Sequence, residues 1–235
     1  MVTTPCEPCV ARAAALMADP TRARMLSYLL SGEFASAGEL ATAASVTPST
    51  ASGHLSKLLD SGLLACEVCG RHRYYRLADA EVAHALEALA MVAERGIHAQ
   101  AWSTPTKQRL RYARCCYGHI AGQIGVSVMQ SLLDRHWLTP DDGGFKVAEV
   151  GASGLSELGI DGAAWLRRSA KGGRGVAYGG LDWSERRDHL AGKLAAEFLR
   201  HFVDKGWLRK TPGDRALEST PPGHVALRAW LPASA

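Results

Sequence analysis

The chain has 235 residues, of which 47% are hydrophobic, and a formal net charge of +4 at pH 7. This length allows one large or two modest domains, and the apolar content supports a packed core. The sequence has no apolar run of about 18 residues, which excludes a transmembrane helix, and its first residues lack the features of a signal peptide. We therefore expect a cytoplasmic protein whose six cysteines are thiols or metal ligands rather than structural disulfides.

The charges are unevenly distributed along the chain. Residues 1–98 hold slightly more acidic than basic side chains, whereas the remainder carries the positive excess. Within residues 47–77, however, the cations outnumber Asp60 and Glu67. Any binding of DNA by the N-terminal part must therefore rely on focused contacts and on dimerisation, with a modest dependence on salt.

Four helices are predicted in the first 60 residues, the first two over residues 10–18 and 20–31. Ser36 and Glu39 have the spacing of a capping box, which opens a third, short helix. Thr47-Pro48 opens the fourth, with proline at the first helical position. One face of this fourth helix is apolar and should point to the core, because the spacing is helical at Ala51, Leu55, Leu58 and Leu59.

A strand-like stretch over residues 64–77 follows, with a basic tip at residues 70–73. The preceding helix carries small polar residues on its other faces, at Ser49, Ser52 and Ser56. A helix of this kind beside a basic hairpin is typical of a winged helix-turn-helix, which lays the helix in the major groove and the wing on the phosphate backbone.

This part of the chain resembles the ArsR-type (ArsR/SmtB) winged helix-turn-helix repressors. The matching blocks are LMADPTRARML at residues 16–26, VTPSTASGHL at 46–55 and GRHRYYRL at 70–77, within a similarity that covers roughly residues 10–98. The resemblance implies a homodimer, joined by the first helix and the helix after the wing, that binds a palindromic operator in double-stranded DNA. A winged helix used for protein contacts alone is the alternative.

The N-terminal half of a recognition helix meets base edges, and a wing meets phosphates. On this basis we expect DNA contacts from Thr47, Ser49, Thr50, Ser52, His54, Lys57, Arg71 and Arg73.

Residues 80–95 predict a further helix with an apolar stripe, and a Gly-, Ser- and Pro-containing stretch follows it. We therefore expect a DNA-binding and dimerisation domain over residues 1–98, a linker over 99–106 and a C-terminal domain over 107–235.

The C-terminal domain contains an internal repeat. HIAGQIGVSVMQSLLDRHWL at residues 119–138 aligns without gaps with HLAGKLAAEFLRHFVDKGWL at residues 189–208. Each copy predicts a helix that runs into Trp-Leu, followed by strand-like residues and another helix. The expected fold is therefore mainly α with small β wings (α+β), a winged helix-turn-helix followed by two degenerate winged-helix-like halves with a sensing role.

Two of the three cysteine pairs have C-x-x-C spacing, at Cys6-Cys9 and Cys66-Cys69. Together they could offer four thiolates to one soft cation. Because residues i and i+3 of a strand point to opposite faces, Cys66 and Cys69 could chelate only at a bulge or turn. Incidental or structural cysteines are the alternative.

The third pair, Cys115-Cys116, is predicted on a basic helix over KQRLRYARCCYGHI at residues 107–120. There Cys115 and His119 would share a helix face, and the surrounding cations would favour a reactive thiolate. The repeat places Glu185 and Arg186 at the corresponding positions, so this half-fold does not require cysteine. We therefore expect Cys115, Cys116 and His119 to sense an inducer.

Together these patterns predict a repressor that an inducer releases from its operator. No cofactor is certain; the expected inducer is a thiophilic metal or metalloid such as As(III), Cd(II), Zn(II) or Hg(II). The metal sites usual in ArsR-type proteins are not matched, since residues 39–43 lack cysteine. An oxidant or an organic effector is therefore the runner-up. The sequence lacks the metalloprotease, hydrolase and P-loop motifs, so an enzyme is not expected, and a thiol-dependent activity is the less favoured alternative.

Overall fold

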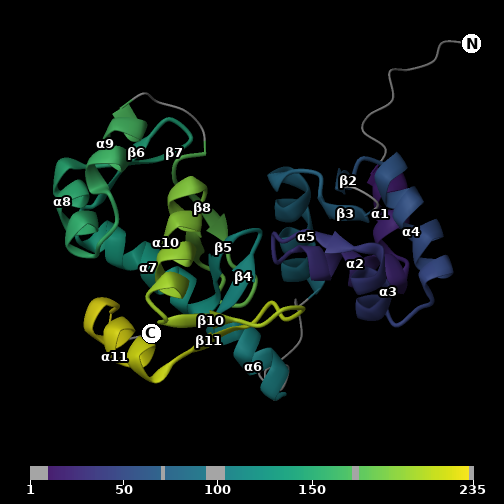
Figure 1. Ribbon diagram of the computed structural model, residues 1–235. Helices are drawn as coiled ribbons and strands as arrows, with labels where there is room; N and C mark the ends of the chain where they lie inside the picture. Colours follow the sequence, from purple (N-terminus) through teal and green to yellow (C-terminus); the bar gives the residue numbers. More distant parts are fainter. Residues whose placement is uncertain (1–9, 70–71, 94–103, 171–174, 233–235) are drawn as a thin grey trace, which may run out of the picture. The chain divides into compact units, whose positions relative to one another are not determined.

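The computed structural model describes residues 10–69, 72–93, 104–170 and 175–232 (Figure 1). The chain divides into two compact units, Met1–Ala83 and His84–Ala235, and each is described by itself. Among the described residues, no helix combines the length and the apolar character needed to cross a membrane.

The first unit is a winged helix-turn-helix. Its helices are α1 (Val10–Met17), α2 (Pro20–Leu29), α3 (Ala37–Ala44) and α4 (Pro48–Asp60). The strands β1 (Ala35–Ser36), β2 (Leu64–Cys69) and β3 (His72–Leu77) form an antiparallel sheet in the order β1-β3-β2. Helix α5 (Ala80–Ala93) begins in this unit and continues into the second. The predicted fold class is confirmed here.

Side-chain caps fix where these helices begin. The carboxylate of Asp19 accepts the N–H of Arg22 at 3.0 Å. Ser36 and Glu39 make both hydrogen bonds of the predicted capping box. Each cap satisfies a backbone donor that the first turn of a helix leaves unpaired. On α4, the predicted core residues Ala51, Leu55 and Leu58 are buried, while Leu59 is half-buried.

The second unit repeats one pattern twice, as helix, hairpin, helix, hairpin, helix. The first half contains α6 (Pro105–Tyr112), β4 (Arg114–Cys116), β5 (His119–Ala121), α7 (Gly122–Asp134), β6 (Leu138–Asp141), β7 (Gly144–Val147) and α8 (Glu149–Glu157). The second half contains α9 (Gly162–Ala170), β8 (Tyr178–Leu181), β9 (Asp188–Ala191), α10 (Lys193–Asp204), β10 (Leu208–Lys210), β11 (Leu217–Ser219) and α11 (Pro221–Trp230). The internal repeat of the sequence is therefore a repeat of structure.

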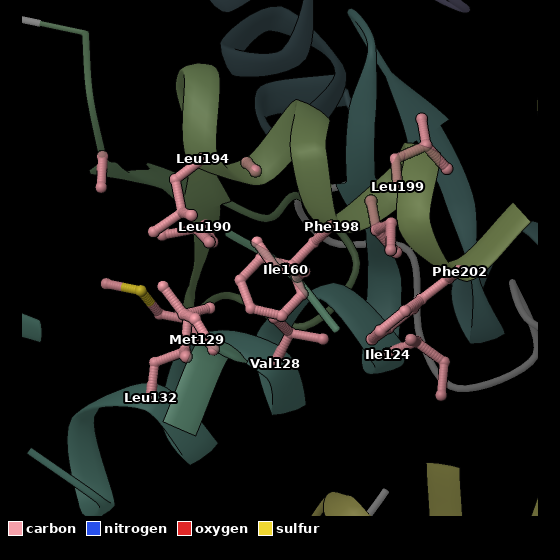
Figure 2. Close-up of a cluster of buried hydrophobic side chains, with 14 of the residues drawn as sticks. Ile124, Val128, Met129, Leu132, Ile160, Leu190, Leu194, Phe198, Leu199 and Phe202 are labelled. Carbon is pink, nitrogen blue, oxygen red and sulfur yellow. The ribbon is translucent and has the colours of Figure 1, made fainter. Parts of the chain in front are cut away.

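The two halves interlock. Helix α7 of the first half packs on β9 of the second, and α10 of the second packs on β5 of the first. Single backbone bridges also join Arg114 to Ala216 and Phe145 to Ala177, which link hairpins of one half to the other. Between them lies the hydrophobic core shown in Figure 2, to which α7 and α10 contribute Ile124, Val128, Met129, Leu132, Leu194, Phe198, Leu199 and Phe202.

The Trp-Leu end of each repeated helix is held by a glycine of the following helix. A Cβ atom at Gly223 would lie 2.0 Å from the carbonyl oxygen of Trp207, and one at Gly151 would lie 2.2 Å from that of Trp137. No side chain fits at such distances, so the helix can approach the tryptophan backbone only where it carries glycine.

The helix predicted over Cys115 and Cys116 is wrong. Helix α6 ends at Tyr112, and both cysteines lie on β4, which pairs with β5 through the tight turn Tyr117-Gly118. Both turn residues have positive φ, as a two-residue hairpin turn requires. The first residues of each repeat copy are likewise strand, not helix. The local pattern missed this because β4 also bonds to residues 215–217, about 100 positions away.

Residues 99–103 of the predicted linker lie outside the described residues. Thr104 caps α6 and Pro105 is its first residue. The predicted domain boundaries therefore stay predictions.

Substituting Gly223→Ala should destabilise the second unit by about 2–3 kcal/mol, because the new methyl group overlaps backbone that must then shift. The six tryptophans all belong to residues 84–235, so tryptophan fluorescence during urea unfolding reports on this unit. Val225→Ala, at an exposed position of the same helix, is the matched control and should stay within about 0.5 kcal/mol of the parent. Equal stability of the two variants would contradict the close approach.

Candidate functional site

Most side chains on the exposed face of α4 are small. Ser49, Ser52, Gly53 and Ser56 are exposed, and so is Lys57 beside them. A Cβ atom at Gly53 would meet nothing within 4 Å, so the packing of the unit does not require glycine there. A mid-helix glycine costs about 0.5–1 kcal/mol relative to alanine. Small side chains on an exposed helix let another molecule come close to the backbone.

Four of the predicted DNA-contacting residues have partners inside the unit: Thr47, Ser49, Thr50 and His54. Thr47 caps the helix, with its hydroxyl 2.9 Å from the hydroxyl of Thr50. His54 is half-buried, and its Nδ1 lies 3.5 Å from a carboxylate oxygen of Asp19. Ser49, Ser52 and Lys57 are all exposed, and the Ser49 hydroxyl lies 3.0 Å from that of Thr47.

The wing is a regular hairpin. Strands β2 and β3 pair residue by residue from Leu64–Leu77 to Cys69–His72. Arg73 is exposed on β3, while Gly70 and Arg71 at the tip lie outside the described residues. The ladder has no bulge between Cys66 and Cys69, so within the described strands these two side chains point to opposite faces. Cys6 and Cys9 also lie outside the described residues.

The second unit brings Cys116, His119 and His189 together, and all three are buried. Cys116 and His119 are partners across the β4–β5 hairpin, and His189 comes from β9 of the other half. Their ligand atoms lie within 4.8 Å of one another. Of the predicted sensing residues, Cys116 and His119 therefore belong to one cluster.

Cys115 does not join this cluster. Neighbouring residues of a strand point to opposite faces, and Cys115 is part of the hydrophobic core. His189 was missed by the sequence reading, although a signal existed: histidine occupies the same position in both copies of the repeat. The two rings stack at a centroid distance of 5.0 Å, with their Nε2 atoms 2.9 Å apart.

Burial makes this cluster uncharged at neutral pH. It raises the pKa of the Cys116 thiol well above its usual value, and the nearby Glu87 carboxylate adds to the effect. Burial also lowers the pKa of His119 well below 6.5 and that of His189 to about 4. The expectation that neighbouring cations favour a thiolate is therefore wrong for Cys116, because desolvation outweighs the attraction of Arg114 and Arg215.

The carboxylate of Asp182 lies next to the ring of His189, on the side away from His119. It is fully buried and accepts hydrogen bonds from the N–H of Gly122 at 2.7 Å and from Arg114 at 3.0 Å. Burial alone would raise the pKa of Asp182, but Arg114, Ser184 and Gly122 outweigh it and lower the pKa to about 2. One carboxylate oxygen lies 3.6 Å from Nδ1 of His189, a buried atom with no hydrogen-bond partner.

Arg114 connects this carboxylate to α5. Its guanidinium is fully buried and lies 3.0 Å from Asp182 and 3.3 Å from Glu87. Glu87 belongs to α5 and also pairs with Arg215. Beside these groups is a cavity of about 340 Å³, lined by the three clustered residues together with His84, Met91 and Tyr178 among others. A cavity of about 490 Å³ near Tyr112 and His224 lies away from the cluster.

Comparison with known proteins adds a family relationship. Residues 17–67 match a family model described as a helix-turn-helix domain. A Bacillus subtilis protein described as an uncharacterized HTH-type transcriptional regulator, YdfF, is 38% identical over 224 residues, which cover 95% of this chain and 97% of that protein. The similarity to YdfF therefore spans both units.

Shorter similarities cover between 37% and 38% of the chain. The HTH-type transcriptional regulator CmtR of Mycobacterium tuberculosis is 42% identical over 86 residues, which cover 37% of this chain and 72% of CmtR. The homodimeric winged helix-turn-helix DNA-binding domain of Mb0332 from Mycobacterium bovis, described as a possible ArsR-family regulator, is 29% identical with a TM-score of 0.36. That match covers 38% of this chain and 82% of the solved domain.

Substituting Glu87→Ala should destabilise the second unit by about 3–5 kcal/mol, because it leaves the buried Arg114 guanidinium without one of its two carboxylates. Urea unfolding followed by tryptophan fluorescence measures the change. Glu81→Ala removes an exposed carboxylate from the same helix and should shift stability by no more than about 0.5 kcal/mol. If both variants unfold at the urea concentration of the parent, the Arg114–Glu87 pair does not support the fold.

Proposed function

Because the chain belongs to a family of HTH-type transcriptional regulators and its first unit resembles the ArsR-type repressors, we propose that it is a dimeric repressor. In this proposal it binds a palindromic DNA site through the first unit and leaves that site when an inducer binds the second unit. The observation that carries it is that the chain has both an open face of small residues on α4 and a buried cluster of one thiol and two imidazoles in the other unit.

The DNA-binding part of the proposal follows from the surface of α4. Exposed hydroxyls of Ser49 and Ser52 can donate to or accept from base edges, and the neighbouring Gly53 adds no side chain that would hold the groove away. Lys57 and Arg73 supply positive charge for phosphates. Because the unit as a whole is not basic, these few contacts must carry the affinity.

Dimerisation is supported by apolar side chains that are exposed on α1 and α5. Val10 of α1 is 75% exposed, and Leu89 and Val92 of α5 are about half exposed. These are the two helices that form the dimer interface in the family that the sequence resembles. A dimer would present two α4 helices to successive major grooves, which requires a DNA site with two-fold symmetry.

For the inducer we propose a thiophilic metal ion that reaches Cys116 from the cavity beside it. Helix α5 offers a route for coupling, because it starts at Ala80 in the DNA-binding unit and carries Glu87 into the buried network of the other. An inducer acts only if it binds the DNA-free arrangement better than the DNA-bound one. The cavity volume also favours a second candidate, a small organic effector.

Introducing a carboxylate on the open face of α4, as Ser49→Glu or Ser52→Glu, should weaken specific DNA binding at least 100-fold, because the new charge would face phosphates and base edges. The measurement is fluorescence anisotropy with a DNA site selected in vitro by the parent protein. Ser153→Glu, at an exposed position of α8, is the control of equal charge and should bind like the parent. Parental affinity in both α4 variants would favour a winged helix that contacts proteins instead.

The wing makes a different prediction, since a phosphate contact carries no sequence information. Arg73→Ala should weaken specific and non-specific DNA binding alike, and should reduce the slope of log affinity against log salt by about one. Titrations at several salt concentrations, with selected and scrambled DNA, test both statements. A loss restricted to the selected site would show that Arg73 reads bases.

A further inference from the structure

The two histidines of the buried cluster face each other through the same atom. Nε2 of His119 and Nε2 of His189 are 2.9 Å apart, and both rings are buried. A neutral imidazole has one nitrogen that donates and one that accepts. The contact is therefore favourable only when one Nε2 carries a hydrogen, or when a cation lies between the two nitrogens.

The surroundings of both rings favour a hydrogen on the other nitrogen, Nδ1. In His189, Nδ1 lies 3.6 Å from the Asp182 carboxylate and has no other partner. His119 also hydrogen-bonds to the backbone of Tyr117, and its Nδ1 is the ring nitrogen that does not face His189. With both rings in this form, the two Nε2 lone pairs would converge, as those of two ligands of one cation do.

Cys116 completes a set of ligands at the same place. We propose that Cys116 Sγ, His119 Nε2 and His189 Nε2 bind a divalent transition-metal ion of the zinc class, with a fourth coordination position open toward the cavity of about 340 Å³. The proposal rests on the proposed function, since it names the site and the chemical class of the inducer. Three protein ligands and one open position is the pattern of zinc sites that accept an exchangeable fourth ligand.

The three ligand atoms would need to move only slightly to bind a metal ion tetrahedrally. In a tetrahedral site with Zn–N bonds of about 2.1 Å, two nitrogen ligands lie about 3.4 Å apart. The Nε2 atoms, now 2.9 Å apart, would need to separate slightly while Cys116, within 4.8 Å, moves inward. Asp182 would then hold the Nδ1–H of His189, as second-shell carboxylates do for metal-binding histidines.

The donor atoms narrow the choice of ion. Imidazole suits zinc, copper and nickel, thiolate suits softer ions, and hard ions such as Mg²⁺ prefer oxygen. One sulfur and two nitrogens form a borderline set, with fewer thiolates than As(III) or Hg(II) would need for a stable complex. Of the inducers expected from sequence, the cluster therefore favours Zn(II).

Binding would also join the two halves of the unit. Cys116 and His119 belong to the first half and His189 to the second, so one ion would tie together the β5 and β9 hairpins. Because the thiol is buried, it ionises only as the metal replaces its proton, which is released to solvent. The same cavity is lined by His84 and Met91 of α5, which places the open coordination position next to the helix proposed to couple the units.

The test is a titration of the metal-free full-length chain with Co²⁺, whose visible spectrum reports tetrahedral geometry and whose near-ultraviolet charge-transfer band reports a thiolate ligand. We expect one Co²⁺ per chain, displacement by Zn²⁺, and a rise in the unfolding temperature. Cys116→Ser and His189→Gln should each weaken binding at least 100-fold and abolish the charge-transfer band or the tetrahedral spectrum. The double variant Cys66→Ser, Cys69→Ser, which removes two thiols of the wing, should bind like the parent.

Circular dichroism of each metal-free variant checks folding, and His119→Gln replaces any variant that does not fold. A charge-transfer band that survives Cys116→Ser, or unchanged affinity in His189→Gln, would overturn the site. Anisotropy with the selected DNA separates this from the proposed function. If cobalt binds as expected but DNA affinity is the same with and without the metal, the metal site is supported and the proposal that the metal is the inducer is wrong. If the protein binds the selected DNA but neither cobalt nor zinc, the proposed metal site is wrong while the proposed DNA-binding function is supported.

Discussion

The arrangement of the second unit depends on one buried guanidinium. Arg114 lies on β4 between the carboxylates of Asp182 and Glu87, without contact with solvent. A buried charge of this kind is tolerated only with close partners, so three distant parts of the chain are fixed around it: strand β4, the loop after β8 and helix α5. In this position the carboxylate of Asp182 also accepts the N–H of Gly122 and lies 3.6 Å from Nδ1 of His189.

The internal repeat explains how the second unit forms the cluster of Cys116, His119 and His189. Most residues shared by the two copies have the same structural task in each, as with Trp137 and Trp207, whose backbones pack against glycine. The histidines differ, because the interlocked halves bring the two copies face to face. A residue repeated in sequence thereby becomes a pair in space. Beside this pair Cys116 has no equivalent in the other half, which makes the site asymmetric and gives it a thiol.

Much of the first unit could be predicted from sequence, because its signals are local. Capping residues such as Ser36 and Glu39 bond within one helical turn, and the apolar spacing of α4 identifies its buried face. The sequence also predicted the family resemblance, the repeat and the α+β class. The exposed serines of α4 follow from the same periodicity. What periodicity does not reveal is that Thr47 and His54 have partners inside the unit.

The candidate metal site was decided by tertiary structure. The sequence identified Cys116 and His119 but placed them on a helix, because a basic stretch without strand alternation favours one. Their hairpin forms because β4 also bonds to residues 215–217, and no local pattern records a partner so far along the chain. The same interlocking supplies His189 and buries the thiol, whose pKa therefore rises where the sequence suggested that it falls. Sequence determined which chemical groups the chain carries, and long-range packing decided which of them meet and in which protonation state.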